Sequence, residues 1–469
     1  MDTLAKKVSA FLLFCSCFFL INLFPSFGLI HNETIATNAL QALFVLLFIT
    51  LSFFEKKRKI KSLFSIRSFL IFTLTGFLVF SINQDMGIYA TVVFLFASLF
   101  FVIKEKKFYK FNRIHYVLIG YAIFRVLGTI GTVHGFYFPD KYLSFFLVPL
   151  AFSCFHFEKA TMLHILRVFI RMMMIYMAFT LLYWWYNIQF LNANILDWVT
   201  LKTNYFGKAA YEWASGWSGY PHPSYVCLVL FSGLIAIIYM VYNKHLGLTI
   251  FDLLIYSILL LFSIAVMESR IGFVCYVFIY VFSGLYLLYL KRWHFKLALG
   301  ILMAFSSISI IAFKDLAYRF AFDNIRETFY IYSIEYIKSH PWWGSGSQEQ
   351  YIALQQEAIK MQKQIPIIWN QSYIHNQFLG NMVQYGVWGA LILLILLAFW
   401  FGYSIRSRNF LLQLFLCVVV FYMMIEEPLT GQAGITRVVL FFSFFVAFND
   451  SEKKTSYFDF TEGKRILEV

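Results

Sequence analysis

Long apolar segments recur along almost the whole chain, and they restrict the possible folds more than any other feature. Hydrophobic residues make up 61% of the 469 residues, whereas charged residues make up only 13%. A soluble protein of this size has too little interior to bury so much apolar surface, so lipid must surround much of it. The sequence therefore predicts an all-α fold, a polytopic bundle of transmembrane helices.

Apolar runs of roughly 17–25 residues, long enough to cross a bilayer, are spread from end to end. We expect about 12–14 transmembrane helices, drawn from candidate spans near residues 8–30, 37–54, 67–83, 87–103, 114–133, 140–155, 161–186, 223–243, 247–267, 271–290, 296–313, 376–402, 409–425 and 432–448. The first run has no clear cleavage site, so we expect it to remain as a membrane helix. Residues 1–469 are thus predicted to be a single integral membrane domain.

Basic residues cluster in short loops between the apolar runs. Residues 55–67, 104–113 and 291–296 and the tail 450–469 lie on the same side of the predicted bundle as the N-terminus. Positively charged loops of membrane proteins face the cytoplasm, so both termini are expected there. Because basic residues cluster in such loops, the net charge of +14 does not make nucleic acid an expected partner.

Two longer loops fall on the opposite, outer side of the predicted bundle. One covers residues 187–223 and the other covers residues 314–374. In the second loop, residues 322–338 lack Pro and Gly and place apolar side chains at helical spacing. Pro341 ends this helix, and residues 349–363 predict a second one. We therefore expect residues 314–374 to form a helical cap on the outer leaflet.

His375 stands where this loop meets the next apolar helix, and Asn376 follows it. Histidine takes up and releases a proton close to neutral pH, so a water-accessible histidine at such a junction suits proton transfer. The alternative is a histidine that merely begins a helix, with Asn376 assisting the cap. The residues alone leave both interpretations open.

Three arginines on the outer side are candidates for binding an anion. Arg270 begins an apolar helix at its outer end, and Arg319 and Arg326 lie just before or within the first cap helix. A guanidinium group binds phosphate oxygens through paired hydrogen bonds. Without a ligand, the same residues are explained as surface charges or, for Arg270, as a partner of Glu268.

Two more residues on this side are candidates for contact with a substrate. His222 lies between two prolines at the mouth of a span, where it either fixes a rigid helix start or contacts substrate. Glu426 begins the polar cluster 426–432 between the last two spans. That cluster orients a base or binds sugar hydroxyls, or it simply forms a turn.

The chain contains no P-loop, no dinucleotide-binding glycine motif and no HExxH zinc motif, and we expect neither a metal nor a cofactor. It also has no soluble domain that would bind a nucleotide sugar. An enzyme of this kind would have to draw its activated donor from the membrane.

The order of these motifs resembles the O-antigen ligase and polysaccharide polymerase family, which are bacterial inner-membrane glycosyltransferases. The resemblance spans roughly residues 215–450. It is carried by Gly219 with His222-Pro223, then Ser269-Arg270, then Arg326 with the segment from Pro341 to Gly346, and then His375-Asn376 with Leu379, Gly386 and Gly389.

The resemblance implies a metal-independent transfer on the periplasmic face of the inner membrane, with inversion at the anomeric carbon. The donor would be a glycan on undecaprenyl diphosphate. The acceptor would be a sugar hydroxyl of lipid A-core in a ligase, or another lipid-linked repeat unit in a polymerase. Arg270 and Arg326, with Arg319 as a further candidate, would hold the diphosphate, and His375 would activate the acceptor hydroxyl.

The large capped loop and the pattern from Glu426 to Gly434 favour a ligase over a polymerase. A transporter or flippase of lipid-linked oligosaccharides is an alternative of a different class. Arg125, Arg167 and Arg171 lie in apolar segments and would suit a transport path, but the internal repeat typical of transporters is not visible.

Overall fold

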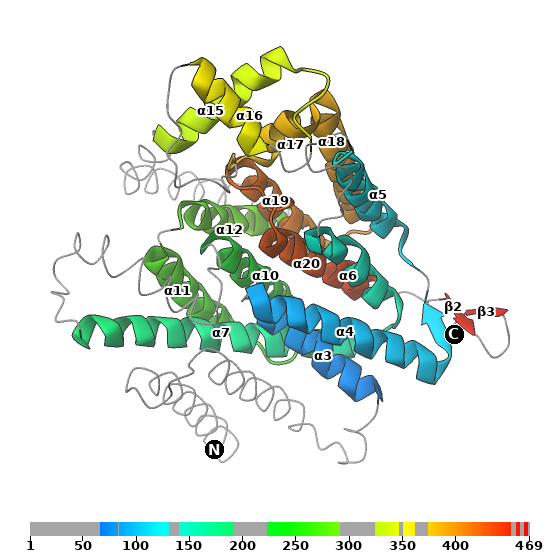
Figure 1. Cartoon of the computed structure of the whole chain (residues 1–469). Helices are drawn as coiled ribbons and strands as arrows, with labels where there is room; N and C mark the ends of the chain where they lie inside the picture. The colour runs from blue at the N-terminus through cyan, green and yellow to red at the C-terminus, as the bar shows by residue number, and fades with distance from the viewer. Residues whose placement is uncertain are drawn as a thin grey trace, which may run out of the picture. The chain divides into compact units, whose positions relative to one another are not determined.

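A computed structural model describes residues 66–82, 84–109, 111–130, 140–190, 223–267, 269–290, 324–346, 350–361, 374–451, 456–459 and 464–467. Figure 1 draws the helices and strands of these residues in colour. The residues form two compact units. The first unit takes the described residues within 1–110, 151–269 and 450–469, and the second takes those within 111–150 and 270–449. The predicted spans at 8–30, 37–54 and 296–313 lie outside the described residues.

The described residues are mostly helical, which confirms the predicted all-α, polytopic class. Four of their helices are long and apolar enough to cross a membrane: Lys159–Ala178, Ser224–Tyr242, Val387–Arg406 and Gln432–Asp450. Shorter apolar helices accompany them at Arg67–Phe80, Lys141–Ser153, Ile250–Ala265, Ile271–Leu285 and Phe410–Ile425. The protein is therefore a membrane protein.

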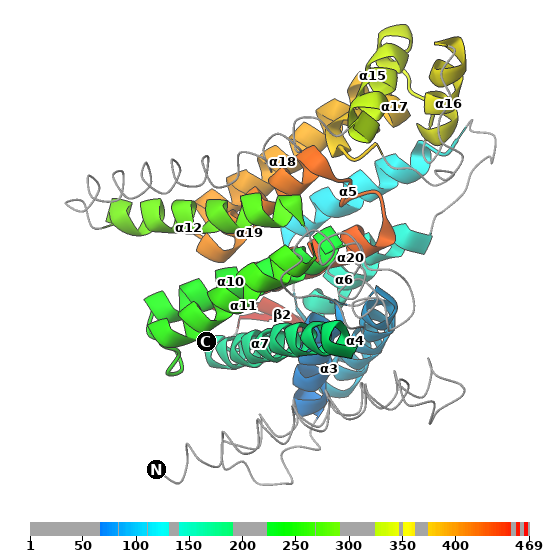
Figure 2. The ribbon, with the colours of Figure 1, turned by 90° about the vertical axis from the view of Figure 1, so that its left-hand side faces the viewer.

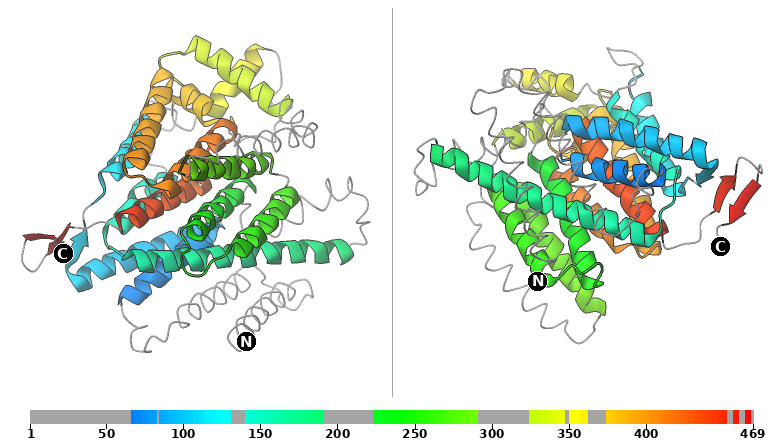
Figure 3. Two further views of the ribbon diagram at one scale, coloured as in Figure 1. Left: turned by 180° about the vertical axis from the view of Figure 1, so that it is seen from behind. Right: turned by 90° about the horizontal axis from the view of Figure 1, so that it is seen from below.

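In the first unit, α3 (Ile66–Phe80) and α4 (Gln84–Glu105) pack side by side (Figure 3). The long helix α7 (Lys159–Phe190) runs along α10 (Pro223–Tyr242) and α11 (Ile250–Val266). Thr249 begins α11 with a capping box, in which its side chain and that of Asp252 bond to each other's backbone N–H.

Within the part of the chain that the structure describes, a small antiparallel sheet departs from the all-helical prediction. Its strands are β1 (Lys107–Tyr109), β2 (Ser456–Asp459) and β3 (Lys464–Leu467), in that order. It joins the segment after α4 to the C-terminal tail. The cytoplasmic position of residues 450–469 stays a prediction.

The second unit holds the candidate site. Its elements in chain order are α5 (Arg113–Leu127), η2 (Asp140–Leu143), α6 (Ser144–Ser153, whose first seven residues belong here), α12 (Arg270–Leu290), α15 (Asn324–Ser339), α16 (Gln350–Lys360), α17 (Gln377–Tyr385), α18 (Val387–Arg406), α19 (Phe410–Ile425) and α20 (Gln432–Asp450). The helix α18 packs against α5 and α19, and α12 runs along α19 (Figure 2).

The single helix predicted over 376–402 is divided at Gly386 into α17 and α18. Gly386 has φ 62°, a backbone conformation that residues with a Cβ rarely adopt. A Cβ there would also overlap the backbone of Trp342, and the Val387 N–H donates to the Pro341 carbonyl at 2.9 Å. A distant turn thus inserts at the break, which the apolar pattern of 376–402 did not reveal.

The cap contains both expected helices. The segment predicted over 322–338 is α15, and the segment predicted over 349–363 is the shorter α16. Their apolar faces form one buried cluster with Ile374 and Val383, residues just before and within α17. Hydrophobic burial therefore fixes the cap on α17. The side of the membrane that it faces stays a prediction.

Candidate functional site

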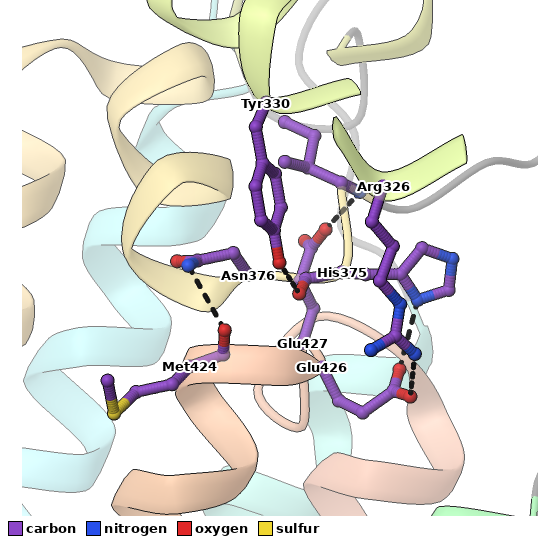
Figure 4. A network of polar contacts seen from close by, with 8 residues as sticks. Arg326, Tyr330, His375, Asn376, Met424, Glu426 and Glu427 are labelled. Carbon is purple, nitrogen blue, oxygen red and sulfur yellow. Dashed lines mark hydrogen bonds and ion pairs between the residues drawn. The ribbon is translucent and has the colours of Figure 1, made fainter. Parts of the chain in front are cut away.

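The central feature of the second unit is a contact between His375 and Glu426 (Figure 4). Nδ1 of the His375 ring lies 3.1 Å from Oε2 of Glu426. His375 directly precedes the N-cap of α17, and Glu426 is the C-cap of α19. The Glu426 side chain is 6% exposed, whereas that of His375 is 19% exposed. The carboxylate is thus covered, while the ring remains accessible.

This contact determines which ring nitrogen is able to accept a proton. An ionised carboxylate only accepts hydrogen bonds, so Nδ1 of His375 donates to Glu426. In the neutral ring, the lone pair then lies on Nε2. Among the residues that the structure describes, Nε2 has no hydrogen-bond partner. The arrangement presents Nε2 as a base.

Arg326 brings a positive charge to the same carboxylate. Its Nη2 lies 3.4 Å from Oε1 of Glu426, so the two carboxylate oxygens face two different partners. Arg326 lies in the first turn of α15, and Tyr330 follows on the same helix face one turn later. The Tyr330 hydroxyl donates to the backbone oxygen of His375 at 3.2 Å (Figure 4). One face of α15 therefore contacts both members of the His375–Glu426 pair.

The backbone at His375 is strained and held on its C-terminal side by a helix cap. His375 has φ 57°, which costs a non-glycine residue about 1–3 kcal/mol. The Asn376 side-chain oxygen accepts from the N–H groups of Phe378 and Leu379, at 3.0 and 3.1 Å. Its amide group donates to the Met424 carbonyl at 3.1 Å. Asn376 thus caps α17 and ties it to the end of α19.

Glu427 follows Glu426 in the chain, and its side chain points toward the backbone of the segment that precedes His375 (Figure 4). Its Oε1 accepts a hydrogen bond from the Ile374 N–H. The carboxyl group is buried against Gly380, where any Cβ would overlap it. Burial raises the pKa of Glu427 above its ordinary value, opposed by the charge of His375, the Ile374 hydrogen bond and the charge of Arg125. Two consecutive carboxyl groups thus have different surroundings.

Arg125 of α5 is fully buried in a polar network beneath this turn. Its guanidinium donates to the hydroxyls of Tyr142 (3.0 Å), Tyr121 (3.2 Å) and Thr430 (3.3 Å), to the Leu429 carbonyl (3.0 Å) and to the Gln384 side chain (3.0 Å). A buried arginine is tolerated only when it is satisfied in this way. Two of these acceptors, Leu429 and Thr430, belong to the turn that contains Glu426 and Glu427.

Gln377 of α17 binds the same turn from the other side. Its amide nitrogen donates to Oγ1 of Thr430 at 3.0 Å, and its oxygen accepts from the Leu429 N–H at 2.8 Å. Gln377 is itself fully buried. The turn between α19 and α20 is therefore bound to both α5 and α17.

The structure brings together three of the seven predicted site residues: His375, Arg326 and Glu426. Asn376 has the capping position, and its contact with substrate stays a prediction. Arg270 begins α12, but the structure does not describe its side chain. Arg319 and His222 are also outside the described residues.

Sequence reasoning had assigned no role to Tyr330 or Gln377. It considered Glu427 only as part of the cluster 426–432, and Arg125 only for a transport path. A signal was present for α17, because Gln377, Asn381 and Gln384 recur at helical spacing beside apolar residues. That pattern marks a polar face directed into an interior. It does not identify the residues that this face contacts, which belong to α5 and to the turn after α19.

Within the described ranges, no group of three or more His, Cys, Asp or Glu side chains is placed to hold a metal ion. The site combines the His375 imidazole, the Arg326 guanidinium and the carboxyl groups of Glu426 and Glu427. Such a set can remove a proton and neutralise a developing negative charge.

Comparison with known families agrees with the motif order. Residues 255–394 match a family model described as O-antigen ligase. This segment is under a third of the chain, includes Arg270, Arg326 and His375, and ends before Glu426. No curated protein matches the sequence. Over this segment the chain is similar to an O-antigen ligase-like family, and the match, together with the apolar helices, supports a membrane enzyme of the O-antigen ligase or polymerase type.

Proposed function

We propose that the protein is an O-antigen ligase that transfers a glycan from undecaprenyl diphosphate to a sugar hydroxyl of lipid A-core. The reaction takes place on the periplasmic face of the bacterial inner membrane. The observation that carries this proposal is the joining of His375, Glu426 and Arg326 beneath a helical cap. These residues come from three separate segments of the second unit.

In the proposed reaction, Nε2 of His375 removes the proton of the acceptor hydroxyl as its oxygen attacks the anomeric carbon. The bond from that carbon to the diphosphate oxygen breaks, and the diphosphate leaves with the bonding electrons. Glu426 holds the ring through Nδ1 and stabilises the imidazolium that forms. Attack opposite the leaving group inverts the anomeric centre.

Arg326 is proposed to neutralise the departing diphosphate, and Arg270 and Arg319 to assist it. A planar guanidinium suits phosphate oxygens, and the Arg326 side chain is 23% exposed. A diphosphate is already a good leaving group, so charge neutralisation and a base suffice for the transfer. This division of roles needs no metal and no cofactor.

Polymerisation of lipid-linked repeat units remains the closest alternative, because it uses the same donor and the same chemistry. Transport is less well supported. Arg125, one of the three arginines considered for a transport path, donates to five protein acceptors in a satisfied buried network.

Deletion of the gene in its host, followed by gel analysis of lipopolysaccharide, tests the proposal. A ligase predicts that the core carries no O-chains while polymer accumulates on the lipid carrier. A core that carries a single repeat unit would instead identify a polymerase. Unchanged lipopolysaccharide would contradict both. Complementation with His375→Ala or Arg270→Ala is expected to leave the deletion phenotype in place.

A further inference from the structure

The strained backbone at His375 requires support from its surroundings. A non-glycine residue keeps a φ of 57° only where neighbouring contacts over-determine the conformation. Three contacts surround it: the Ile374 N–H to Glu427, the His375 oxygen to the Tyr330 hydroxyl, and the Asn376 amide to Met424. Glu427 provides the contact on the N-terminal side.

Glu427 can provide this contact only if its own turn is fixed. That turn is held by Arg125, which donates to Leu429 and Thr430, and by Gln377, which bonds to the same two residues. Arg125 also donates to Gln384, so one guanidinium connects the turn with α17. Within the described residues, contacts therefore run from Arg125 through the turn to Glu427 and Ile374.

The same turn places Glu426. Because Glu426 and Glu427 are consecutive, fixing the carboxyl of Glu427 on the Ile374 backbone also sets the direction in which Glu426 points. The Glu426 carboxylate then reaches the His375 ring at 3.1 Å. The turn thus controls both the backbone of the base and the carboxylate that orients it.

We propose that Arg125 and Glu427 are positioning residues of the transfer reaction, which hold the turn 426–430 against α17 so that His375 and Glu426 keep their geometry. This inference rests on the proposed role of His375. Neither residue is assigned a contact with substrate. Their loss therefore lowers kcat per folded molecule and leaves the KM for the lipid-linked donor unchanged.

The hydrogen bonds of Glu427 and Arg125 determine which substitutions test the proposal. Glu427→Gln keeps a side-chain oxygen for the Ile374 N–H, whereas Glu427→Leu removes it at similar volume. Arg125→Lys keeps the charge but cannot reproduce a planar fork of five hydrogen bonds. Thr430→Val is a milder change that removes the hydroxyl to which both Arg125 and Gln377 donate.

The test uses purified full-length protein in detergent or liposomes, with wild-type protein and His375→Ala in the same assay. Initial rates of glycan transfer give kcat and KM for the lipid-linked donor, and only monodisperse samples are compared. We expect Glu427→Leu and Arg125→Lys to lower kcat by about 10- to 100-fold, because small displacements of a catalytic group have effects of that size. Glu427→Gln should retain most of the activity. The expected fall for Thr430→Val is smaller, and this variant replaces Arg125→Lys if the latter does not fold.

A double variant provides a second readout that general destabilisation would not produce. If Arg125 and Glu427 act through one turn, Arg125→Lys combined with Glu427→Leu should lower kcat by less than the product of the single effects. Wild-type kcat in folded Glu427→Leu and in Arg125→Lys or Thr430→Val would overturn the positioning role, as would a change confined to KM. Absence of transfer by the wild-type protein, or full activity of His375→Ala, would instead contradict the proposed function itself.

Discussion

Nδ1 of His375 lies 3.1 Å from Oε2 of Glu426, although 51 residues separate them in the chain. Two further constraints accompany this contact. Oε1 of the same glutamate faces Arg326, and the backbone oxygen of His375 accepts from Tyr330. A base, the carboxylate that orients it and a guanidinium are thus assembled from the start of α17, the end of α19 and the first turn of α15.

Glu426→Gln is expected to lower kcat by about 10²-fold or more. The glutamine amide can donate to Nδ1 of His375, which favours the tautomer that carries its proton on Nε2. The amide also lacks the negative charge that stabilises the imidazolium. The KM for the donor should change much less than kcat. Steady-state kinetics of glycan transfer measures both values. Glu335→Gln, an exposed glutamate on α15, is the matched control and should behave as wild type. Equal kcat values for Glu426→Gln and wild type would contradict the orienting role.

Arg326→Ala should lower kcat/KM for the lipid-linked donor by about 10- to 100-fold, the value of a charge-assisted hydrogen bond of 1.5–3 kcal/mol. Arg326→Lys should recover part of the loss, since an ammonium keeps the charge but not the planar fork. Lys338→Ala at the other end of α15 is the control, because its exposed amine pairs only locally with Glu335. If Arg326→Ala and Lys338→Ala have the same effect, Arg326 has no specific role with the diphosphate.

Gly386→Ala should destabilise the protein by on the order of 1–3 kcal/mol. The substitution forces a Cβ into a conformation with φ 62° and ψ −151°, directly against the Trp342 backbone. Gly402→Ala in α18 is the matched control, since nothing lies within 4 Å of its Cβ position. We expect the control to be neutral or stabilising by up to about 1 kcal/mol. Thermal unfolding followed by tryptophan fluorescence measures both, and an unchanged Tm for Gly386→Ala would refute the argument.

Glu427→Gln should raise the Tm increasingly as the pH rises. Burial raises the pKa of Glu427 in the folded protein, opposed by His375 and Arg125, which face it, and by hydrogen bonds from Ile374 and Thr430. A carboxyl group with a raised folded pKa favours folding at low pH, and that contribution is lost as the pH rises through the folded value. The amide does not titrate, so the Tm difference should grow with pH and then level off. A difference that shrinks as the pH rises would contradict the raised pKa.

Much of the fold could be predicted because membrane helices and cap helices have strong local patterns. The apolar stripe of α15 and the proline after it are examples. The break at Gly386 could not be predicted, because it depends on the carbonyl of Pro341, which comes from a distant segment.

The candidate site was accessible to sequence reasoning only in part. His375, Arg326 and Glu426 were identified from motif order and position, and the structure places them in contact. Roles of neighbouring residues were not accessible, since Glu426 and Glu427 are identical in type and adjacent in sequence. Arg125 lies 304 residues from the Leu429 carbonyl that it binds, and no local pattern connects them.

The central claim is that His375 is the base for glycan transfer. The most direct measurement is kcat of purified His375→Gln with a lipid-linked glycan donor and a core-sugar acceptor. His340→Gln serves as the control, because His340 lies at the end of α15, stacked on Tyr336. We predict that His375→Gln lowers kcat by about 10²–10⁴-fold while His340→Gln matches wild type. Wild-type kcat in folded His375→Gln would contradict the account.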